Sequence, residues 1–403
     1  MKQAPKGIIF PYFIVIILDA VGFGIVSPIL APLVAHSHSV LLGGFGDFGR
    51  HIIFGLILAI FPLSFMLGAP LLGALSDQWG RKRVLLICLL GTLFGFVLYA
   101  CSFVFSSVLL LILARFLAGF TSASQGVAQA AMVDVSEGKQ KAVNIALIAV
   151  ALTIGLVLGP LLGGVLSDVK WAPWFGMATP FYFIIIVSVL NLVLLQYKIH
   201  DQPNQKTVFS LSEHCQAFVG LFRVRAVASM LLVFFFFELS WSLYYQSLAL
   251  LLVHRFHYHA VGIGLFSSYV GLSLSFGLLV LVRLFVKFSS LSTMIKYSLL
   301  LAVVSILFLY VSQGLWAQYL LAIPMTFAVA LIYSSLVAKV SDLVDRHHQG
   351  LLMGVTDALL ALAFAITGFL SGWLAYFDVK LPELLAAGFM LAAWLLFRRT
   401  EMR

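Results

Sequence analysis

The stretch Gly73-Ala-Leu-Ser-Asp-Gln-Trp-Gly-Arg-Lys-Arg-Val-Leu-Leu86 is the polar interruption between two long apolar segments, residues 51–75 and 84–104. A connection this short predicts that the two segments form an antiparallel pair. It contains an acid, a turn glycine and three consecutive cations, which are Asp77, Gly80, Arg81, Lys82 and Arg83. The stretch therefore predicts a charged turn at one end of a helix pair.

Apolar segments of about this length recur along the whole chain. Hydrophobic residues make up 62% of the sequence and charged residues only 10%, whereas a soluble protein carries about 25% charged residues. About 20 apolar residues in a helix cross a hydrocarbon core of about 30 Å. The sequence thus predicts an all-α membrane protein with twelve transmembrane helices, at 8–34, 51–75, 84–104, 108–132, 143–166, 174–196, 226–253, 260–283, 293–312, 315–338, 349–373 and 382–397.

The positive charge is distributed unevenly between the two sides of these spans. If the N-terminus is cytoplasmic, all of the 24 Lys and Arg residues lie on the cytoplasmic side except Arg115, within a span, and Arg50, Lys170, Arg255 and Lys380, in outer loops. This bias follows the positive-inside rule. It predicts that both termini are cytoplasmic, most simply in a bacterial inner membrane, and that the net charge of +9 reflects topology and not nucleic-acid binding.

The longest polar segment divides the spans into two sets of six. We expect an N-terminal six-helix bundle over 1–196, a central cytoplasmic loop over 197–225 and a C-terminal six-helix bundle over 226–403. A second copy of the charged turn would lie between the eighth and ninth spans, where only Arg283 and Lys287 are found. The two halves are therefore not equivalent.

The charged turn resembles the signature loop of the major facilitator superfamily of transporters, G-x-x-x-D-x-x-G-R-[KR]. The resemblance implies the two-bundle facilitator fold, with a substrate site midway through the membrane between the bundles. Asp77 is expected to face the N-terminus of a neighbouring helix, where the dipole favours an anion, and the cations to bind acids or lipid phosphates. The alternative is a basic loop that determines the membrane topology and has no latch function. The predicted cytoplasmic latch consists of Gly73, Asp77, Gly80, Arg81, Lys82 and Arg83.

The fifth span contains the string Gly155-Leu-Val-Leu-Gly159-Pro160-Leu-Leu-Gly163-Gly164. Small residues four apart let helix backbones approach closely, and a proline inside a helix removes a hydrogen bond. Glycines alone would indicate only tight packing. The full string is similar to the motif of the antiporter branch of the superfamily, and it favours export over uptake.

The first span contains Leu18-Asp19-Ala-Val-Gly22-Phe-Gly24-Ile-Val-Ser-Pro28. This resembles the D-x-x-G-x-G-x-x-x-P pattern of twelve-span drug:proton exporters, the tetracycline-exporter-like group. A carboxyl group buried in a span exchanges a proton near neutral pH more readily than an exposed one. Asp19 is therefore a candidate for proton coupling, with a structural acid bonded to a neighbouring helix as the equal alternative.

The fourth span carries Arg115 in a segment similar to the R-x-x-x-G motif of the family. A charge at the centre of a span costs about 2.5–3.5 kcal/mol on insertion scales, so Arg115 is expected to face the bundle interior. Ser122 and Gln129 follow at seven-residue spacing on one helical stripe, with Gln125 beside it. We predict a coupling role for Arg115 and a cavity lined by the three polar residues; the alternative is an arginine that only holds helices together.

The seventh span places Glu238, Trp241, Ser242 and Tyr245 at i, i+3, i+4 and i+7, on one helical face. An acid among aromatic and hydroxyl groups suits a cationic or polar organic ligand. The alternative is a lone acid in a wet cavity. Asp357 in the eleventh span is a further candidate acid, nearer the cytoplasmic end, where latching is the other possible role.

Neither an enzyme nor a cofactor site is predicted. The chain has no nucleophile–base pair and no G-x-x-x-x-G-K-[ST] loop for ATP. His-x-His pairs can bind metal, but exposed loop histidines without an acid or thiol framework usually do not, so no metal site is expected. The histidines placed outside are His36, His38, His51, His254, His257 and His259.

These patterns predict a proton-coupled transporter that exports a small organic molecule by alternating access, with the proton gradient as its energy source. It is expected to act as a monomer, with membrane lipid as its other partner and no nucleic acid. Proton-driven transport of a siderophore or nutrient on the same fold, including uptake, stays open. A membrane sensor that transports nothing is a remote alternative.

Overall fold

Twelve helical spans in the described residues are long and apolar enough to cross a membrane. The computed structural model describes residues 9–35, 39, 41–134, 138–199, 224–345 and 349–401, so most of the predicted central loop, residues 197–225, lies outside them. The twelve predicted spans are confirmed, as Ile9–Ala35, Asp47–Trp79, Arg81–Val104, Val108–Asp134, Leu147–Val165, Thr179–Lys198, Arg225–Phe256, Ala260–Phe285, Leu291–Val311, Leu315–Ser341, Leu351–Phe377 and Leu381–Glu401.

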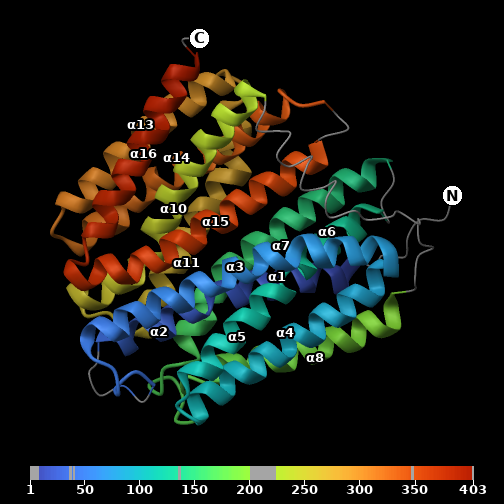
Figure 1. The fold of residues 1–403 in the computed structure, drawn as a ribbon, viewed down its shortest axis with the longest axis vertical. Coiled ribbons are helices and arrows are strands. Elements are labelled where there is room, and N and C mark those ends of the chain that lie inside the picture. The colour runs from blue at the N-terminus through green and yellow to red at the C-terminus, as the bar shows by residue number, and fades with distance from the viewer. Residues whose placement is uncertain are drawn as a thin grey trace. The chain divides into compact units, whose positions relative to one another are not determined.

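Several spans contain more than one helical element. In chain order the elements, all but η1 and α12 labelled in Figure 1, are α1 (Ile9–Gly24), α2 (Val26–Ala35), α3 (Asp47–Trp79), α4 (Arg81–Val104), α5 (Val108–Thr121), α6 (Ser124–Asp134), α7 (Gly138–Val165), α8 (Thr179–Lys198), α10 (Arg225–Phe256), α11 (Ala260–Phe276), η1 (Gly277–Leu281), α12 (Val282–Phe285), α13 (Leu291–Val311), α14 (Leu315–Ser341), α15 (Gln349–Phe377) and α16 (Leu381–Glu401).

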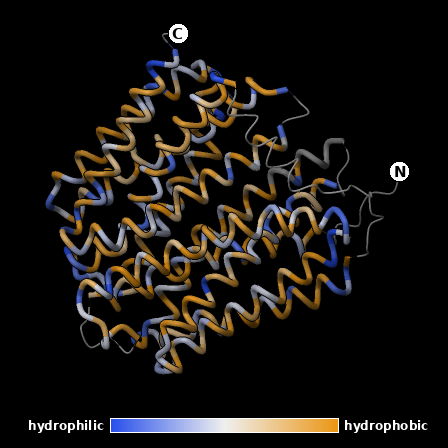
Figure 2. Tube along the Cα trace, viewed as in Figure 1, coloured by the Kyte–Doolittle hydropathy of each residue, from blue (hydrophilic) through white to orange (hydrophobic). Residues whose placement is uncertain are grey.

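Most helices are longer than the apolar segments that predicted them; the sixth, predicted at 174–196, is shorter and begins at Thr179. The second helix was expected to end at residue 75, yet α3 continues through the polar residues Ser76 to Gln78 and ends at Trp79. The last span was expected at 382–397 and continues to Glu401. Figure 2 shows hydrophobic residues along most of each helix and hydrophilic residues gathered near the helix ends. Polar residues thus extend the helices beyond the apolar core.

The chain divides into two compact units. The first unit comprises Met1–Arg50, Ile60–Phe209 and Tyr258–Ser268, and the second comprises His51–Ala59, Ser210–His257 and Tyr269–Arg403. In the first unit, α1 packs against α7, and α4 packs against α5 and α8. In the second, α10 packs against α15 and α16, and α13 packs against α14 and α16. The predicted division at 196 and 226 stays a prediction.

The eighth span contains a π-helical turn. Between α11 and α12 lies the five-residue π-helix η1, where the N–H of Val282 bonds to the carbonyl of Gly277, five residues earlier. A β-carbon on Gly277 would lie 2.7 Å from the β-carbon of Ala330 in α14. The π turn therefore lies directly against α14.

Candidate functional site

The predicted turn glycine of the charged stretch is confirmed. Gly80 is the single residue between α3 and α4, and its φ of 95° lies in the region that residues with a β-carbon rarely adopt. This one-residue connection reverses the chain. Gly73 lies within α3, and a β-carbon added there would meet nothing within 4 Å.

Arg81 makes the central contacts of this turn. Its Nη1 lies 2.7 Å from the carboxylate of Asp77, and its Nε lies 3.2 Å from the carboxylate of Asp134 in α6. Arg81 is the first residue of α4, so this ion pair holds Asp77 near the N-terminus of that helix; an interaction of Asp77 with the helix dipole stays a prediction. Arg81 therefore connects α3, α4 and α6.

The remaining cations of the turn differ in their surroundings. The Lys82 ammonium donates a hydrogen bond of 2.9 Å to the carbonyl of Gln196, near the end of α8. Arg83 is exposed. The turn thus contacts four helices of the first unit, and its role as a latch stays a prediction.

The glycine string of the fifth span lies where α7 packs against α1. A β-carbon on Gly159 would lie 2.9 Å from the carbonyl oxygen of Val21, and one on Gly163 would collide with that of Ile25. Gly155 faces Ala20 of α1 in the same way. The predicted close approach of helix backbones is therefore confirmed.

Two further members of this string extend the contact. Pro160 lies inside α7, which continues through it, and a β-carbon on Gly24 would lie 2.9 Å from its Cδ. Gly164 faces α11, where a β-carbon would lie 3.1 Å from the α-carbon of Gly264. The string therefore packs against both α1 and the first residues of α11.

Asp19 is buried in the first unit, with 3% of its surface exposed. Its Oδ2 accepts a hydrogen bond from the hydroxyl of Ser124, the first residue of α6. This bond matches the structural alternative for Asp19, a carboxyl group bonded to a neighbouring helix, although its Oδ1 is buried without a hydrogen-bond partner among the described residues. A proton-coupling role for Asp19 stays a prediction.

Arg115 is also buried, with 1% of its surface exposed. Its Nη1 lies 3.4 Å from the hydroxyl of Tyr99, and its guanidinium carbon lies 4.7 Å from the ring centroid of Phe61. A cation over an aromatic face is stabilised electrostatically, more strongly where water is excluded. The expectation that Arg115 lies in the interior is confirmed.

The polar stripe predicted to follow Arg115 does not lie on one continuous helix. The fourth span is interrupted between α5 and α6, at Ser122 and Ala123. The Ser122 hydroxyl bonds back to the carbonyl of Ala118 at 2.9 Å, while Gln125 and Gln129 are half-buried on α6. Seven-residue spacing across a break no longer fixes a shared face, so the predicted lining of Ser122, Gln125 and Gln129 lacks its geometric basis.

Glu238 occupies the middle of α10 in the second unit. It is 1% exposed, and its Oε2 is buried without a hydrogen-bond partner among the described residues. Trp241 is 8% exposed, and its ring centroid lies 5.6 Å from that of Tyr245. The face predicted from the sequence therefore brings an acid and two aromatic rings together.

Two other helices bring ionisable groups toward Glu238. Asp357 of α15 interacts with it electrostatically, and Tyr333 of α14 interacts with both carboxyl groups. The Tyr333 ring lies 6.0 Å from that of Phe234. Asp357 keeps an exposed surface whereas Glu238 is buried. The structure thus groups Asp357 with Glu238, and it adds Tyr333, which no pattern in the sequence marked.

A chain of hydroxyl and amide groups links α10 to α15 beside this acid. The Ser242 hydroxyl donates to the backbone carbonyl of Glu238 at 2.5 Å, and it lies 2.8 Å from the Thr367 hydroxyl. Gln246 donates to that hydroxyl at 2.9 Å and to the carbonyl of Phe364 at 3.0 Å. Ser242 therefore helps to hold α15 against the Glu238 face, a role the sequence did not indicate.

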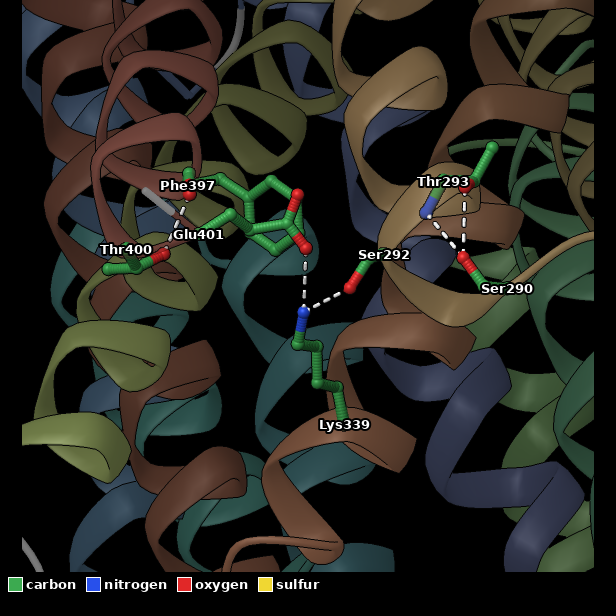
Figure 3. Close-up of polar contacts among 7 residues, drawn as sticks. All are labelled: Ser290, Ser292, Thr293, Lys339, Phe397, Thr400 and Glu401. Atoms are coloured by element: carbon green, nitrogen blue, oxygen red, sulfur yellow. Dashed lines mark hydrogen bonds and ion pairs between the residues drawn. The ribbon is translucent and has the colours of Figure 1, made fainter. Parts of the chain in front are cut away.

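Another polar cluster lies where the ends of α13, α14 and α16 meet. In Figure 3 the Lys339 ammonium lies between Glu401, at 3.0 Å, and the Ser292 hydroxyl. The same ammonium lies 4.9 Å from the ring centroid of Phe397. A cavity of about 560 Å³ opens here, lined by Ala226, Ser229, Met230, Lys339, Leu343, Thr400 and Glu401.

Two histidines expected in exposed outer loops lie in helices instead. His51 belongs to α3 and is 2% exposed, and its ring centroid lies 5.5 Å from that of His254 in α10. Helices that extend beyond their apolar segments account for the difference. A β-carbon on Gly55 would lie 2.7 Å from the carbonyl oxygen of Phe369, so α3 and α15 also approach closely near these rings.

Comparison with known proteins identifies the family. The model of the Major Facilitator Superfamily matches residues 12–312 and 230–402, which together span nearly the whole chain. The chain belongs to the Major Facilitator Superfamily. It is therefore a transporter of this superfamily and an integral, multi-pass membrane protein, and not an enzyme.

Curated relatives of this superfamily member include drug-resistance proteins. The chain is 29% identical over 365 residues to the class C tetracycline resistance protein of Escherichia coli, a match that covers 87% of this chain and 85% of the relative. It is 26% identical over 399 residues to the quinolone resistance protein NorA of Staphylococcus aureus, with 95% and 94% covered. The relatives are thus of efflux type, at modest identity.

Solved structures confirm the facilitator fold. The human organic anion transporter MFSD10 aligns with a TM-score of 0.71 at 20% identity, covering 98% of this chain and 100% of the other. A bacterial homolog of the human lysosomal transporter Spinster aligns with a TM-score of 0.78 at 12% identity, covering 100% and 98%. At these identities the likeness concerns the fold alone.

Proposed function

We propose that this transporter exports a small organic molecule in exchange for protons and that Glu238 binds the two in turn. The observation that carries the proposal is the burial of Glu238 near Asp357 and Tyr333, with one oxygen that has no partner among the residues the structure describes. An ionised carboxylate in such a place is costly unless a proton or a cationic group compensates it. If a proton and a substrate compete for one carboxylate, binding of one requires release of the other. This competition couples their movements in opposite directions.

The neighbours of Glu238 suit an organic ligand with a positive or polar group. Trp241 and Tyr245 present aromatic rings on the same helical face as the acid, and aromatic faces attract organic cations. Asp357 adds a second negative group. The substrate is therefore expected to be an aromatic or amphiphilic molecule that carries a positive or strongly polar group.

Export is favoured over uptake by the resemblance of the full Gly155–Gly164 string to the antiporter motif and by the names of the curated relatives. The close packing of α7 against α1 is compatible with either direction, whereas the curated relatives are tetracycline and quinolone resistance proteins. Inward proton movement can supply the energy, because each charge crossing 100 mV releases about 2.3 kcal/mol. Asp19 and Arg115 are retained as secondary coupling candidates.

The proposed orientation follows the distribution of cations. The helix ends at Gly80 and Lys339 carry most of the Lys and Arg residues and are assigned to the cytoplasm, while the ends at Arg255 and Lys380 face outward. Both termini are then cytoplasmic, in a bacterial inner membrane. The protein is expected to work as a monomer.

Transport in proteoliposomes tests this function. Purified protein is reconstituted with a pH gradient as the driving force, and uptake of radiolabelled tetracycline and of a fluoroquinolone is measured in both gradient directions. We expect substrate to accumulate on the acidic side, and a protonophore to abolish the accumulation. Accumulation of a probe on the alkaline side would indicate symport, and accumulation that persists with the protonophore would rule out proton coupling.

A further inference from the structure

Glu383 is a buried carboxyl group that the proposed function does not use. It lies in the first turn of α16 and is 1% exposed. Both of its carboxyl oxygens are buried without a hydrogen-bond partner in the part of the chain that the structure describes. An ionised carboxylate in this position is costly, and a bound proton or cation removes that cost. Such a group therefore indicates a binding site.

Tyr244 of α10 also has a buried polar atom without a partner within the described part of the chain, and it faces Glu383. Its hydroxyl is likewise buried without a hydrogen-bond partner among the described residues, and it interacts electrostatically with Glu383. The Ser240 hydroxyl donates to the carbonyl of Ala386 at 2.6 Å. Since α10 and α16 run in opposite directions, this bond places Tyr244, one turn after Ser240, beside Glu383, about one turn before Ala386.

The charged groups around Glu383 are Lys380 and Asp378, which precede α16, and Arg255 at the end of α10. Lys380 donates its ammonium to the carbonyl of Tyr310 at 2.8 Å. Arg255 donates to the carbonyl of Ser312 at 2.9 Å. Both cations are thus bonded to the end of α13, and neither forms an ion pair with Glu383 within the described residues.

Other titratable groups face this cluster from the neighbouring helices. Tyr269 of α11 interacts with Tyr244 and donates its hydroxyl to the carbonyl of Tyr319 in α14 at 2.8 Å. The Tyr269 hydroxyl is therefore bonded to α14, and Tyr244 is the donor left to face Glu383.

We propose that Glu383 is a second proton-binding site of the transporter, near the outer ends of α10 and α16; this rests on the proposed proton coupling and orientation. A proton from hydronium neutralises the carboxylate and leaves water behind. On release to water the carboxylate becomes an acceptor for the Tyr244 hydroxyl. Because Tyr244 and Glu238 belong to the same helix, α10, protonation of Glu383 changes a contact of the helix that carries the substrate-binding acid.

Infrared difference spectroscopy of the reconstituted protein tests proton binding without any substrate. We expect wild-type protein, titrated from about pH 5 to about pH 9, to show a carboxylic acid C=O band that Glu383→Gln removes. Asp378→Asn is the matched control, since it removes an exposed carboxylate from the same helix end, and it should leave the band unchanged. An identical titration in Glu383→Gln would overturn the proposal. So would a band that responds to sodium chloride at constant pH, which indicates a metal-cation site.

A transport measurement separates this proposal from the proposed function. With tetracycline as the probe, Glu383→Gln is expected to lower pH-driven accumulation about tenfold, while tetracycline exchange without a gradient continues. Normal accumulation in Glu383→Gln would overturn the second site and leave the proposed function intact. If wild-type protein shows no pH-driven transport, the proposed function fails, and the infrared titration still decides whether Glu383 binds a proton.

Discussion

The two halves of the chain bury charge in different ways. In the N-terminal half, one oxygen of Asp19 accepts a hydrogen bond from Ser124 of a neighbouring helix, while the other is buried without a partner among the described residues. Arg115 lies against Tyr99 and the Phe61 ring. In the C-terminal half, Glu238 and Glu383 keep buried oxygens without partners among the described residues. A side chain bonded to a neighbouring helix is held in one arrangement, whereas a carboxyl group without such a bond can take up and release a ligand.

The comparison predicts its largest effect at Glu238. Glu238→Gln keeps the size of the side chain and removes its ability to exchange a proton, so pH-driven transport of tetracycline should fall by about 100-fold or more. Asp345→Asn, which alters an exposed acid of the same half, is the control and should transport normally. Transport by Glu238→Gln at the wild-type rate would remove the main support for the proposed function.

The next largest effect is expected in thermal stability. It shows whether the N-terminal half depends on close backbone contacts. Gly163→Ala places a methyl group against the Ile25 carbonyl, and such overpacking costs about 1–3 kcal/mol. Gly388→Ala in α16 is matched to it, because a β-carbon there meets nothing within 4 Å. We expect a clearly lower melting temperature in detergent for Gly163→Ala alone. Equal melting temperatures would contradict the tight packing of α1 against α7.

A smaller effect is expected at Asp19. Asp19→Asn keeps an oxygen that can accept the Ser124 hydrogen bond, so pH-driven transport should stay within about tenfold of wild type. The measurement is the initial rate of tetracycline accumulation, beside that of Glu238→Gln. If the two variants lose transport equally, the buried acids of the two halves are equivalent and the comparison fails.

The smallest effect is expected at the end of the second unit shown in Figure 3. Lys339 and Glu401 form a partly exposed ion pair, and such pairs contribute about 0–1 kcal/mol. Lys339→Ala should therefore lower the thermal stability only slightly, and less at high salt because ions screen the pair. A loss as large as that of Gly163→Ala would show that this cluster is essential to the fold.

The helical spans could be predicted because length and hydrophobicity decide them locally. The ends could not, since polar residues such as Ser76 and Gln78 continue a helix as readily as they begin a loop. The break after Thr121 was missed for a related reason. Ser122 bonds to its own helix, and no proline or glycine marks the position in the sequence.

The arrangement of the candidate site was predicted only within one helix: Asp357 was named as a candidate acid, but its place near Glu238 was not predicted. The face of Glu238, Trp241 and Tyr245 follows from helical periodicity. Tyr333 and Thr367 could not be found in this way, because each contributes through a contact with a helix about 100 or more residues away. Glu383 was overlooked because an acid near the start of a span is usually the edge of the apolar segment, and only packing shows that this one is buried.

The π-helix at Gly277–Leu281 should allow the eighth span to lose one residue without changing the orientation of its two ends. A π turn accommodates one extra residue in an α-helix while the flanking turns keep their orientation. Deleting one residue there would convert η1 to ordinary α-helix, and α11 and α12 would keep their neighbours. The same deletion elsewhere in α11 would rotate all that follows by about 100°. This span therefore carries a spare residue, at a point where insertions and deletions can accumulate during evolution without changing which side chains face α14.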